Sequence, residues 1–462
     1  MDITKPIVWV PAGVGLAGAA AIAFWLLSPP PAVVERVPGL DNESNAATAA
    51  DSWEGKLVKG PGQPADIPGS WPQFRGPNRD NICTDPTPLA RSWPESGPKV
   101  LWEVDVGEGF AAPAVWNGRV YLMDYDRENQ ADALRCLSLA DGREIWRYTY
   151  PARIKRDHGM SRTIPAVTEQ CVIALGPKCH LIAVNPLTGE LLWKKNLVKE
   201  YDVEVPPWYA GQCPLIDNGR LILGTGGKHL LVALDALTGK MIWATPNTNR
   251  WQMTHSSVAV TEFKGRRIYV YCASGGVAGV AASDGQLLWQ TPEWRISIAN
   301  VPTPLPVGDG RIFLSGGYNA GSMMLQMKEK DGGVAVETLF RLKASVFGAT
   351  QQTPIFHLNH IFGVRPDGQL VCLDLNGQII WESGPANKFG SGPFLIAHDL
   401  FYLMNDEGVL TMAEVSTSGY KQLARAKVLS GHDSWGPMAL VNGRLLVRDT
   451  GKLACLLVGA SN

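Results

Sequence analysis

One unit recurs along this chain from Phe110 to its end, and its most regular part is a strand, a Gly-containing turn and a tryptophan. Clear copies are LRCLSLADGREIW, LIAVNPLTGELLW, LVALDALTGKMIW, VAGVAASDGQLLW and LVCLDLNGQIIW, which end at Trp146, Trp193, Trp243, Trp289 and Trp381. The first four tryptophans are spaced by roughly 46 to 50 residues, and the last follows after about two such units. This period is typical of a four-stranded propeller blade, whereas most solenoid repeats are shorter and helical.

Each unit also has an upstream half, in which two apolar strands flank a polar turn. APAVWNGRVYLM from Ala112 and GPMALVNGRLLVRD from Gly436 are two of eight such segments. Asn-Gly and Asp-Gly pairs between alternating apolar and polar residues indicate β-hairpins, because these residues reach the positive φ of a tight turn. The sequence therefore predicts an all-β fold, an eight-bladed β-propeller of four-stranded antiparallel blades.

The eighth unit ends at KLACLLVGA and lacks a fourth strand. The segment KVLWEVDV, residues 99–106, precedes the first blade and has the pattern of a fourth strand, with its own Trp102. We expect this segment to complete blade 8. The two ends of the propeller would then share one blade, and the ring would have no open edge for pairing with other chains.

The repeat resembles the AxDxxTGxxxW unit of the eight-bladed superfamily of pyrroloquinoline-quinone (PQQ) dehydrogenases. The best copy is Ala233 to Gly239 followed by Trp243, and the resemblance covers roughly Ser70 to Asn462. It implies that each repeated Trp packs against the next blade. The repeat is also similar to that of the propeller lipoprotein of the outer-membrane β-barrel assembly machine, which implies partner binding through loops on one face.

The N-terminal region differs in composition from the repeats. After a tail of residues 1–6, residues 7–27 form an uncharged apolar stretch about long enough to cross a bilayer. We expect an uncleaved transmembrane anchor that places the propeller on the periplasmic, extracytoplasmic side of the cell membrane; a cleaved signal peptide and a buried helix are the alternatives. Residues 28–69, rich in Pro, Ala and Gly, are predicted to be a disordered linker, residues 70–98 a lead-in arm, and residues 99–462 the propeller.

Composition excludes one class of partner and constrains the cysteines. Lys plus Arg is 42 and Asp plus Glu is 43, so the chain lacks the basic character of nucleic-acid-binding proteins. Cys136, Cys372 and Cys455 occupy third-strand positions that are Ala in other units, which predicts small buried side chains. Cys171 and Cys179 flank a short hairpin and are the one plausible disulfide pair, and no zinc-binding spacing occurs.

In a propeller, the loops that lead into the innermost strands open on one face around the central channel. In this chain these loops are polar and aromatic, while the repeat itself is not, so we expect their side chains to converge at the channel mouth. The predicted ligand-binding residues are His158, Arg162, Trp208, Gln212, Trp251, His255, Asn300, Gln351, Lys388 and Trp435. Purely structural roles for the same polar residues are the alternative.

The resemblance to quinoproteins raises the question of PQQ held by calcium. The mouth loops offer few acids, namely Asp157, Glu204 and Asp433, with Asn300 as an amide, whereas Ca²⁺ takes six to eight oxygens. His432 and Asp433 are the candidates for a catalytic acid–base pair. The leading hypothesis is a membrane-anchored binding or scaffold protein that contacts envelope proteins. The alternatives are a PQQ-dependent dehydrogenase and a carbohydrate- or polymer-binding module.

Overall fold

The computed structural model describes residues 15, 18–19, 22–23, 53–155 and 158–460. The chain divides into two units, Met1–Val37 and Pro38–Asn462. In the first unit the five described residues are helical. Within the described parts of the chain, no helix combines the length and the apolar character needed to cross a bilayer. The predicted anchor at 7–27 lies almost entirely outside the described residues, as does the predicted linker up to residue 52.

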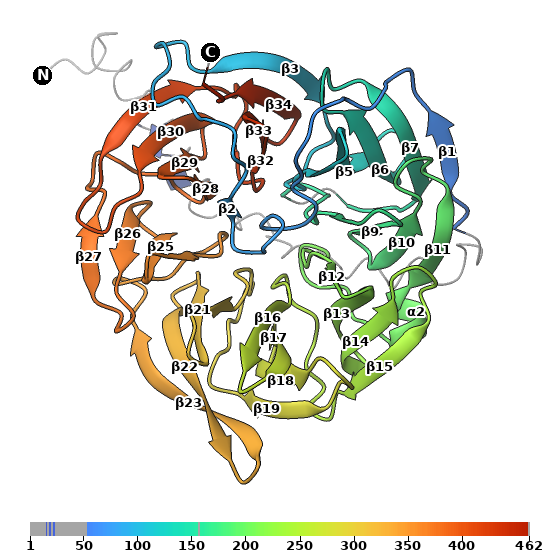
Figure 1. The fold of residues 1–462 in the computed structure, drawn as a ribbon, viewed down its shortest axis with the longest axis vertical. Coiled ribbons are helices and arrows are strands. Elements are labelled where there is room, and N and C mark those ends of the chain that lie inside the picture. The colour runs from blue at the N-terminus through green and yellow to red at the C-terminus, as the bar shows by residue number, and fades with distance from the viewer. Residues whose placement is uncertain (1–14, 16–17, 20–21, 24–52, 156–157, 461–462) are drawn as a thin grey trace, which may run out of the picture. The chain divides into compact units, whose positions relative to one another are not determined.

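The second unit is an eight-bladed β-propeller, as the repeat predicts (Figure 1). All strand pairs within the four-stranded blades are antiparallel. The strands of each blade are given from the innermost outwards. Blade 1 consists of β4 (Ala114–Trp116), β5 (Arg119–Asp126), β6 (Ala131–Ser138) and β7 (Glu144–Pro151), and blade 2 of β8 (Ala166–Val167), β9 (Val172–Leu175), β10 (His180–Val184) and β11 (Leu191–Asn196). Blade 3 consists of β12 (Leu215–Asp217), β13 (Arg220–Gly226), β14 (His229–Asp235) and β15 (Met241–Pro246), and blade 4 of β16 (Ala259–Phe263), β17 (Arg266–Ala273), β18 (Gly276–Ala281) and β19 (Leu287–Thr291).

Blades 5 to 8 continue around the ring in the same way, and a short helix, α2 (Leu197–Tyr201), follows β11. In the same order, blade 5 consists of β20 (Leu305–Pro306), β21 (Arg311–Gly316), β22 (Gly321–Lys330) and β23 (Gly333–Leu342), and blade 6 of β24 (Ile355–His357), β25 (His360–Val364), β26 (Leu370–Leu373) and β27 (Ile379–Glu382). Blade 7 consists of β28 (Phe394–Ala397), β29 (Leu400–Met404), β30 (Val409–Glu414) and β31 (Gln422–Lys427), and blade 8 of β32 (Ala439–Val441), β33 (Arg444–Arg448), β34 (Lys452–Leu457) and β3 (Lys99–Asp105). The pairing of β3 with β34, in which Trp102 lies opposite Cys455, confirms the predicted ring closure.

The repeated Trp and Gly dock between neighbouring blades. A Cβ built on the turn glycine would lie 2.6 Å from Cδ2 of the Trp146 ring at Gly189, and the backbone there has φ +74°. The Trp102 indole also donates to Leu139 O of the next blade at 3.0 Å. Equivalent contacts join the pairs Trp102–Gly142, Trp193–Gly239 and Trp243–Gly285. The Trp therefore packs against the next blade, and only glycine leaves room for its ring.

The cysteines form no disulfides and lie in the core. All eight are free and buried, and Cys136, Cys372 and Cys455 have no exposed surface, as predicted. Cys171 and Cys179 are not joined by a disulfide.

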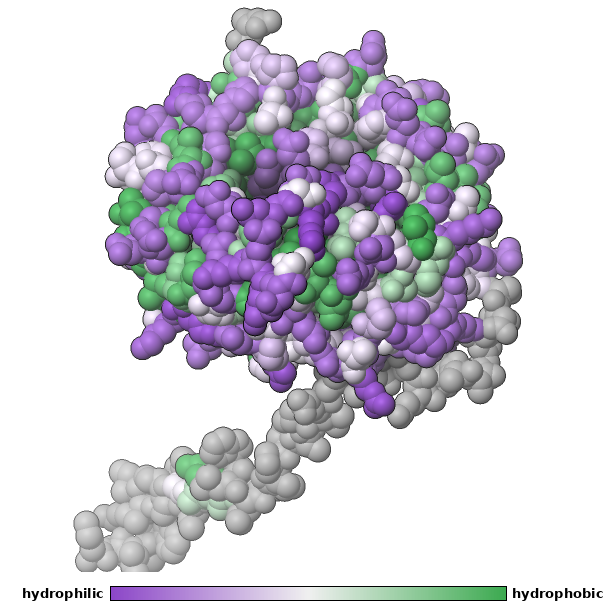
Figure 2. Space-filling view, turned by 60° about the horizontal axis from the view of Figure 1, so that its bottom comes forward, coloured by the Kyte–Doolittle hydropathy of each residue, from purple (hydrophilic) through white to green (hydrophobic). Residues whose placement is uncertain are grey.

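The surface lacks a dominant apolar area on the face shown in Figure 2, where hydrophilic residues predominate and hydrophobic residues occur in small groups.

Residues 53–69 differ from the prediction of a disordered linker. β1 (Lys56–Lys59) pairs antiparallel with β7 and adds a fifth, outer strand to blade 1. The Trp53 ring lies 4.7 Å from the His180 ring, and Ala65 N donates to Gly118 O. These contacts satisfy a strand edge and partly bury an aromatic ring, which composition alone does not reveal.

The lead-in arm crosses the channel. Residues 71–83, which we call the plug segment, contact the innermost strands of several blades, and β2 (Ile82–Cys83) pairs in parallel with β28 on its channel side. Trp71 forms a bridge with Val115 in blade 1, while Arg75 donates to Thr353 O and Pro354 O at blade 6, both at 3.0 Å. The plug segment therefore closes one end of the channel.

Candidate functional site

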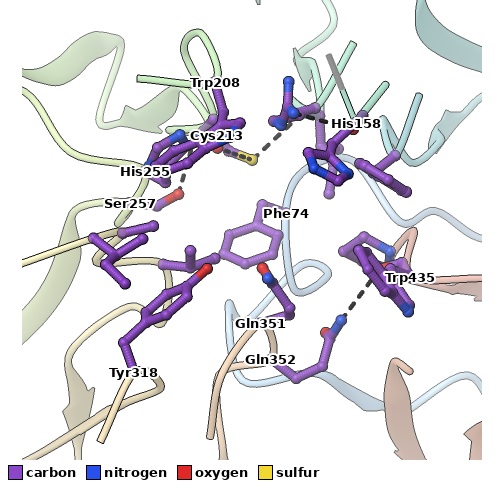
Figure 3. A pocket seen from close by; sticks show the side chains of 18 residues that line it. Phe74, His158, Trp208, Cys213, His255, Ser257, Tyr318, Gln351, Gln352 and Trp435 are labelled. Carbon is purple, nitrogen blue, oxygen red and sulfur yellow. Dashed lines mark hydrogen bonds between the residues drawn. The ribbon is translucent and has the colours of Figure 1, made fainter. Parts of the chain in front are cut away.

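A cavity of about 330 Å³ lies at the other end of the channel, among the loops that join the outermost strand of one blade to the innermost strand of the next (Figure 3). We call these segments the mouth loops. The lining residues are Phe74, Phe110, His158, Arg162, Ile164, Trp208, Gly211, Cys213, His255, Ser257, Ile298, Ala299, Val301, Tyr318, Gln351, Gln352, Trp435 and Pro437. Most of this surface is apolar or aromatic. Phe74 belongs to the plug segment and therefore forms the inner end of the cavity.

Six of the ten predicted ligand-binding residues line this cavity. They come from the mouth loops of blades 2, 3, 4, 6 and 8, so segments far apart in sequence meet here because the ring brings equivalent loops together. The six are His158, Arg162, Trp208, His255, Gln351 and Trp435. Gln352, which follows Gln351, also lines the cavity, and its amide donates to Trp435 O at 3.2 Å.

Four predicted residues lie elsewhere. Gln212 is fully buried and bonds both the N–H and the carbonyl of Gly224, which makes it a brace for β13. Trp251 is buried next to Gly275 and Gly276 at the start of β18. Asn300 is 4% exposed and faces the interior, and Lys388 forms a bridge with Gln369 at the surface. Of these four side chains, Gln212 satisfies backbone groups, whereas the amide nitrogen and oxygen of Asn300 are buried without a hydrogen-bond partner among the described residues.

The candidate acid–base pair lies outside the cavity lining. His432 Nδ1 is 3.0 Å from Asp433 Oδ2, and the His432 side chain is 79% exposed. The two side chains therefore contact each other in solvent. A water-exposed pair lacks the low-dielectric surroundings that tune catalytic groups.

Sequence reasoning missed Phe74, Phe110, Tyr318, Cys213 and Ser257. Phe110 lies in residues 106–113, the mouth loop of blade 1, and applying the mouth-loop rule to this first blade would have found it. Tyr318 lies in the turn between β21 and β22, which opens on the same face as the mouth loops. Phe74 carries no sequence signal of this kind, because only the path of the plug segment brings it into the channel.

One wall of the cavity is fixed by stacking. The Phe110 and Trp435 rings lie 5.2 Å apart with an interplanar angle of 26°, and Arg162 Cζ lies 5.9 Å from the Phe110 ring centre. The Trp435 indole N–H donates to Asp406 Oδ1 at 2.7 Å. Because stacking and the indole bond hold this wall in place, a ligand would meet a preorganised surface.

The opposite wall contains an imidazole that stays neutral. Burial lowers the pKa of His255 to about 4, and the Arg162 charge acts in the same direction. Near neutral pH this ring is therefore uncharged, and it also bonds to the backbone at Pro207 and Tyr209. Burial also raises the pKa of the Cys213 thiol to about 11, so this sulfur remains protonated and unreactive.

The backbone near this wall is unusual. Trp208 and Tyr209 have φ values of 61° and 70°, and His158 has φ 43°. Large side chains seldom adopt the left-handed region, and two in succession cost free energy that the surrounding structure must supply. The conformation points Trp208 towards the cavity and buries Tyr209 completely.

The described lining residues do not fit a calcium-held quinone. Calcium takes six to eight oxygens, usually with carboxylates among them, and none of the described lining residues is Asp or Glu. No group of three or more His, Cys, Asp or Glu in the described part of the chain could hold a metal ion. Asp157, one of the predicted acids, lies outside the described residues.

A second cavity, of about 300 Å³, lies between the plug segment and the innermost strands of blades 3 to 6. Phe74, Cys213 and Ser257 line both cavities. The Phe74 ring therefore stands between two chambers of one channel, and the first cavity is a cup with a single mouth.

Comparisons with known proteins agree with this architecture. The structure of BamB from Moraxella catarrhalis is 14% identical, with 78% of this chain and 100% of that chain covered and a TM-score of 0.52. A computationally designed protein, Ika8, gives 12% identity, the same coverage and a TM-score of 0.52. A quinohemoprotein alcohol dehydrogenase from Pseudomonas putida HK5 gives 12% identity over 86% of this chain and 81% of that one, with a TM-score of 0.45. At these identities, the two structures with a TM-score of 0.52 show a shared fold alone.

No curated protein sequence matches the chain. A family model described as outer membrane protein assembly factor BamB matches residues 84–205 and 202–383. These two ranges together span more than half of the chain. The chain therefore belongs to the BamB family of eight-bladed propellers.

Proposed function

We propose that this protein is a non-catalytic binding or scaffold protein of the cell envelope. In this proposal residues 7–27 anchor it in the membrane, the propeller lies on the extracytoplasmic side, and a partner binds at the mouth of the channel. The family description, an outer membrane protein assembly factor, supports a role in assembly. The uncharged stretch at 7–27 supports the anchor.

The observation that carries the proposal is the difference between the two channel ends. One end is filled by the plug segment, while at the other the unrepeated mouth loops gather six predicted binding residues around a cup. The repeated frame does not need these side chains for its own packing, since its Trp and Gly dock at the blade boundaries. The described lining also lacks the carboxylates that a quinone and calcium would need.

Site-specific cross-linking in native membranes tests this proposal. A photoreactive amino acid at Ile298, which lines the cavity and is 48% exposed, is compared with one at Leu358, which is 55% exposed in the hairpin turn of blade 6. We expect a reproducible adduct with the same envelope polypeptide from position 298 and none from position 358. Equal adducts from both positions, or none from position 298, would remove the support for a binding role of the mouth.

A second measurement addresses the anchor and the cofactor together. Full-chain protein is expected to remain in the membrane pellet after carbonate extraction, and deletion of residues 7–27 to release it. The purified protein is expected to show no saturable binding of PQQ in the presence of calcium and no dye reduction with alcohols. Turnover with alcohols would move the protein to the enzyme class.

A further inference from the structure

The cup at the channel mouth is lined by five aromatic side chains from five separate segments (Figure 3). They are Phe74 of the plug segment, Phe110, Trp208 and Trp435 of three mouth loops, and Tyr318 of the turn after β21. None of these positions belongs to the repeated frame. Rings that converge on one cavity from unrelated segments favour a planar, polarisable guest, which they can contact by offset stacking or edge to face.

The polar groups of the cup are largely committed to its own walls. Ser257 Oγ accepts from Cys213 N at 3.0 Å, and Cys213 Sγ accepts from Ile164 N at 3.4 Å. The Gln352 amide donates to Ser391 O and Trp435 O. A sugar needs a hydrogen-bond partner for nearly every hydroxyl group that it buries, so this lining suits a sugar poorly. A guest with few polar atoms matches it better.

The size and shape of the cup limit the guest further. A cavity of about 330 Å³ is at the small end of the range for ligand sites, which suits one ring system rather than a chain of sugars. The Phe74 ring closes the inner end, so the guest must enter from the mouth and stop there. At the rim, Ile298 and Tyr318 are 48% and 41% exposed, which leaves apolar surface for groups that remain outside.

We propose that this cup binds the aromatic side chain of a partner polypeptide, with the partner backbone outside the mouth and Phe74 setting how deeply the ring enters. This inference rests on the proposed binding function and specifies its chemistry. The stacked Phe110–Trp435 wall holds one face of the guest, and the neutral His255 ring faces it without a charge that would need solvation. Ile298 and Tyr318 contact the residues that flank the ring.

Ligand-observed NMR titrations on the full chain in detergent test the inference. The probes are N-acetyltryptophanamide, N-acetylphenylalaninamide, N-acetylleucinamide and maltose. We expect saturable binding of the two aromatic amides, about two- to tenfold tighter than that of the leucine amide, and no saturation by maltose. Equal affinity for the leucine amide, saturation by maltose, or no aromatic binding would overturn the inference.

Two residues with similar exposure and backbone conformation provide the variant and its control. Tyr318 and Leu358 are both exposed and have similar backbones, with φ values of 54° and 49°, but only Tyr318 lines the cup. Tyr318→Ser should weaken the aromatic amides severalfold, and Leu358→Ser should leave them unchanged. If both variants behave alike, the measured binding does not occur at the cup and the inference fails.

A second variant tests the inner boundary. Phe74→Ala removes the ring between the cavities of about 330 and about 300 Å³ and should shift the preference towards the larger tryptophan ring. An unchanged preference in a folded variant contradicts the role given to Phe74. The Ile298 cross-linking experiment reports independently on partner binding. If position 298 gives an adduct but the NMR titrations show no preference for aromatic amides, this inference is wrong and the scaffold proposal is unaffected.

Discussion

The two ends of the central channel are built from different interactions, although the same eight blades surround both. At the closed end, the plug segment bonds mainly to backbone groups: Arg75 is 5% exposed and donates to carbonyls of blade 6 and of its own segment. At the open end, side chains from the mouth loops face one another around a cup. The comparison teaches that one frame can support a structural end and a binding end, because the repeated Trp–Gly contacts between blades involve residues of neither end.

The largest expected effect is at the closed end. Arg75→Ala removes a buried guanidinium and leaves several carbonyls, among them Thr353 O and Pro354 O, without donors, so we expect a loss of about 4 kcal/mol in the free energy of unfolding. At the open end, the Gln351 side chain is half-buried, so Gln351→Ala should lower the free energy of unfolding by about 1 kcal/mol or less. Urea unfolding of the full chain measures both. Comparable losses would break the distinction between the two ends.

Adding a single methyl group at a Trp–Gly contact between blades should lower the stability of the protein. Gly189→Ala places a Cβ 2.6 Å from Trp146 Cδ2 at φ +74°, and we expect a loss of about 3 kcal/mol from strain and overpacking. Gly219 has the same φ of +74° with nothing within 4 Å, so Gly219→Ala isolates the backbone term, about 1 kcal/mol. Thermal unfolding compares the two variants. A similar shift for both would show that inter-blade docking is not limiting.

The smallest effect is a pH dependence at the open end. The folded-state pKa of His255, about 4, lies below its ordinary value of 6.5, so the unfolded state binds the proton more tightly. Stability from this group is therefore complete above pH 6.5 and is lost as the pH falls towards 4, by about 2 kcal/mol at pH 5. His255→Gln should make the fall in the free energy of unfolding between pH 7 and pH 5 smaller by about 2 kcal/mol. His180, whose pKa burial also lowers to about 4, provides the same slope in both proteins and so cancels in the difference.

Much of this fold could be predicted from local sequence. The strand, turn and Trp pattern predicted eight four-stranded blades, and Trp102 in residues 99–106 predicted the closing strand, both of which the structure confirms. These features are readable because each blade repeats the same short-range requirements. The mouth-loop rule likewise placed His158, Arg162 and His255 at one cavity.

Other features depend on contacts that no local pattern encodes. Gln212 and Trp251 have the same residue types as the lining residues, but the first braces β13 and the second packs at the start of β18. Polarity in a mouth loop can satisfy either a ligand or a buried backbone group, and only the direction of the side chain decides between them. The strand β1 in a segment with the composition of a linker is another such case.

By itself, the sequence determined the number of blades, their order and the way the ring closes, because hydrophobic alternation and turn residues act over a few positions. Only the tertiary structure decided which end of the channel is open. That outcome depends on where residues 71–83 dock, and therefore on the burial of Arg75 and Phe74 against strands that lie hundreds of positions away along the chain. The cup exists because the ring sets the distance between its loops, and the plug segment gives it an inner end.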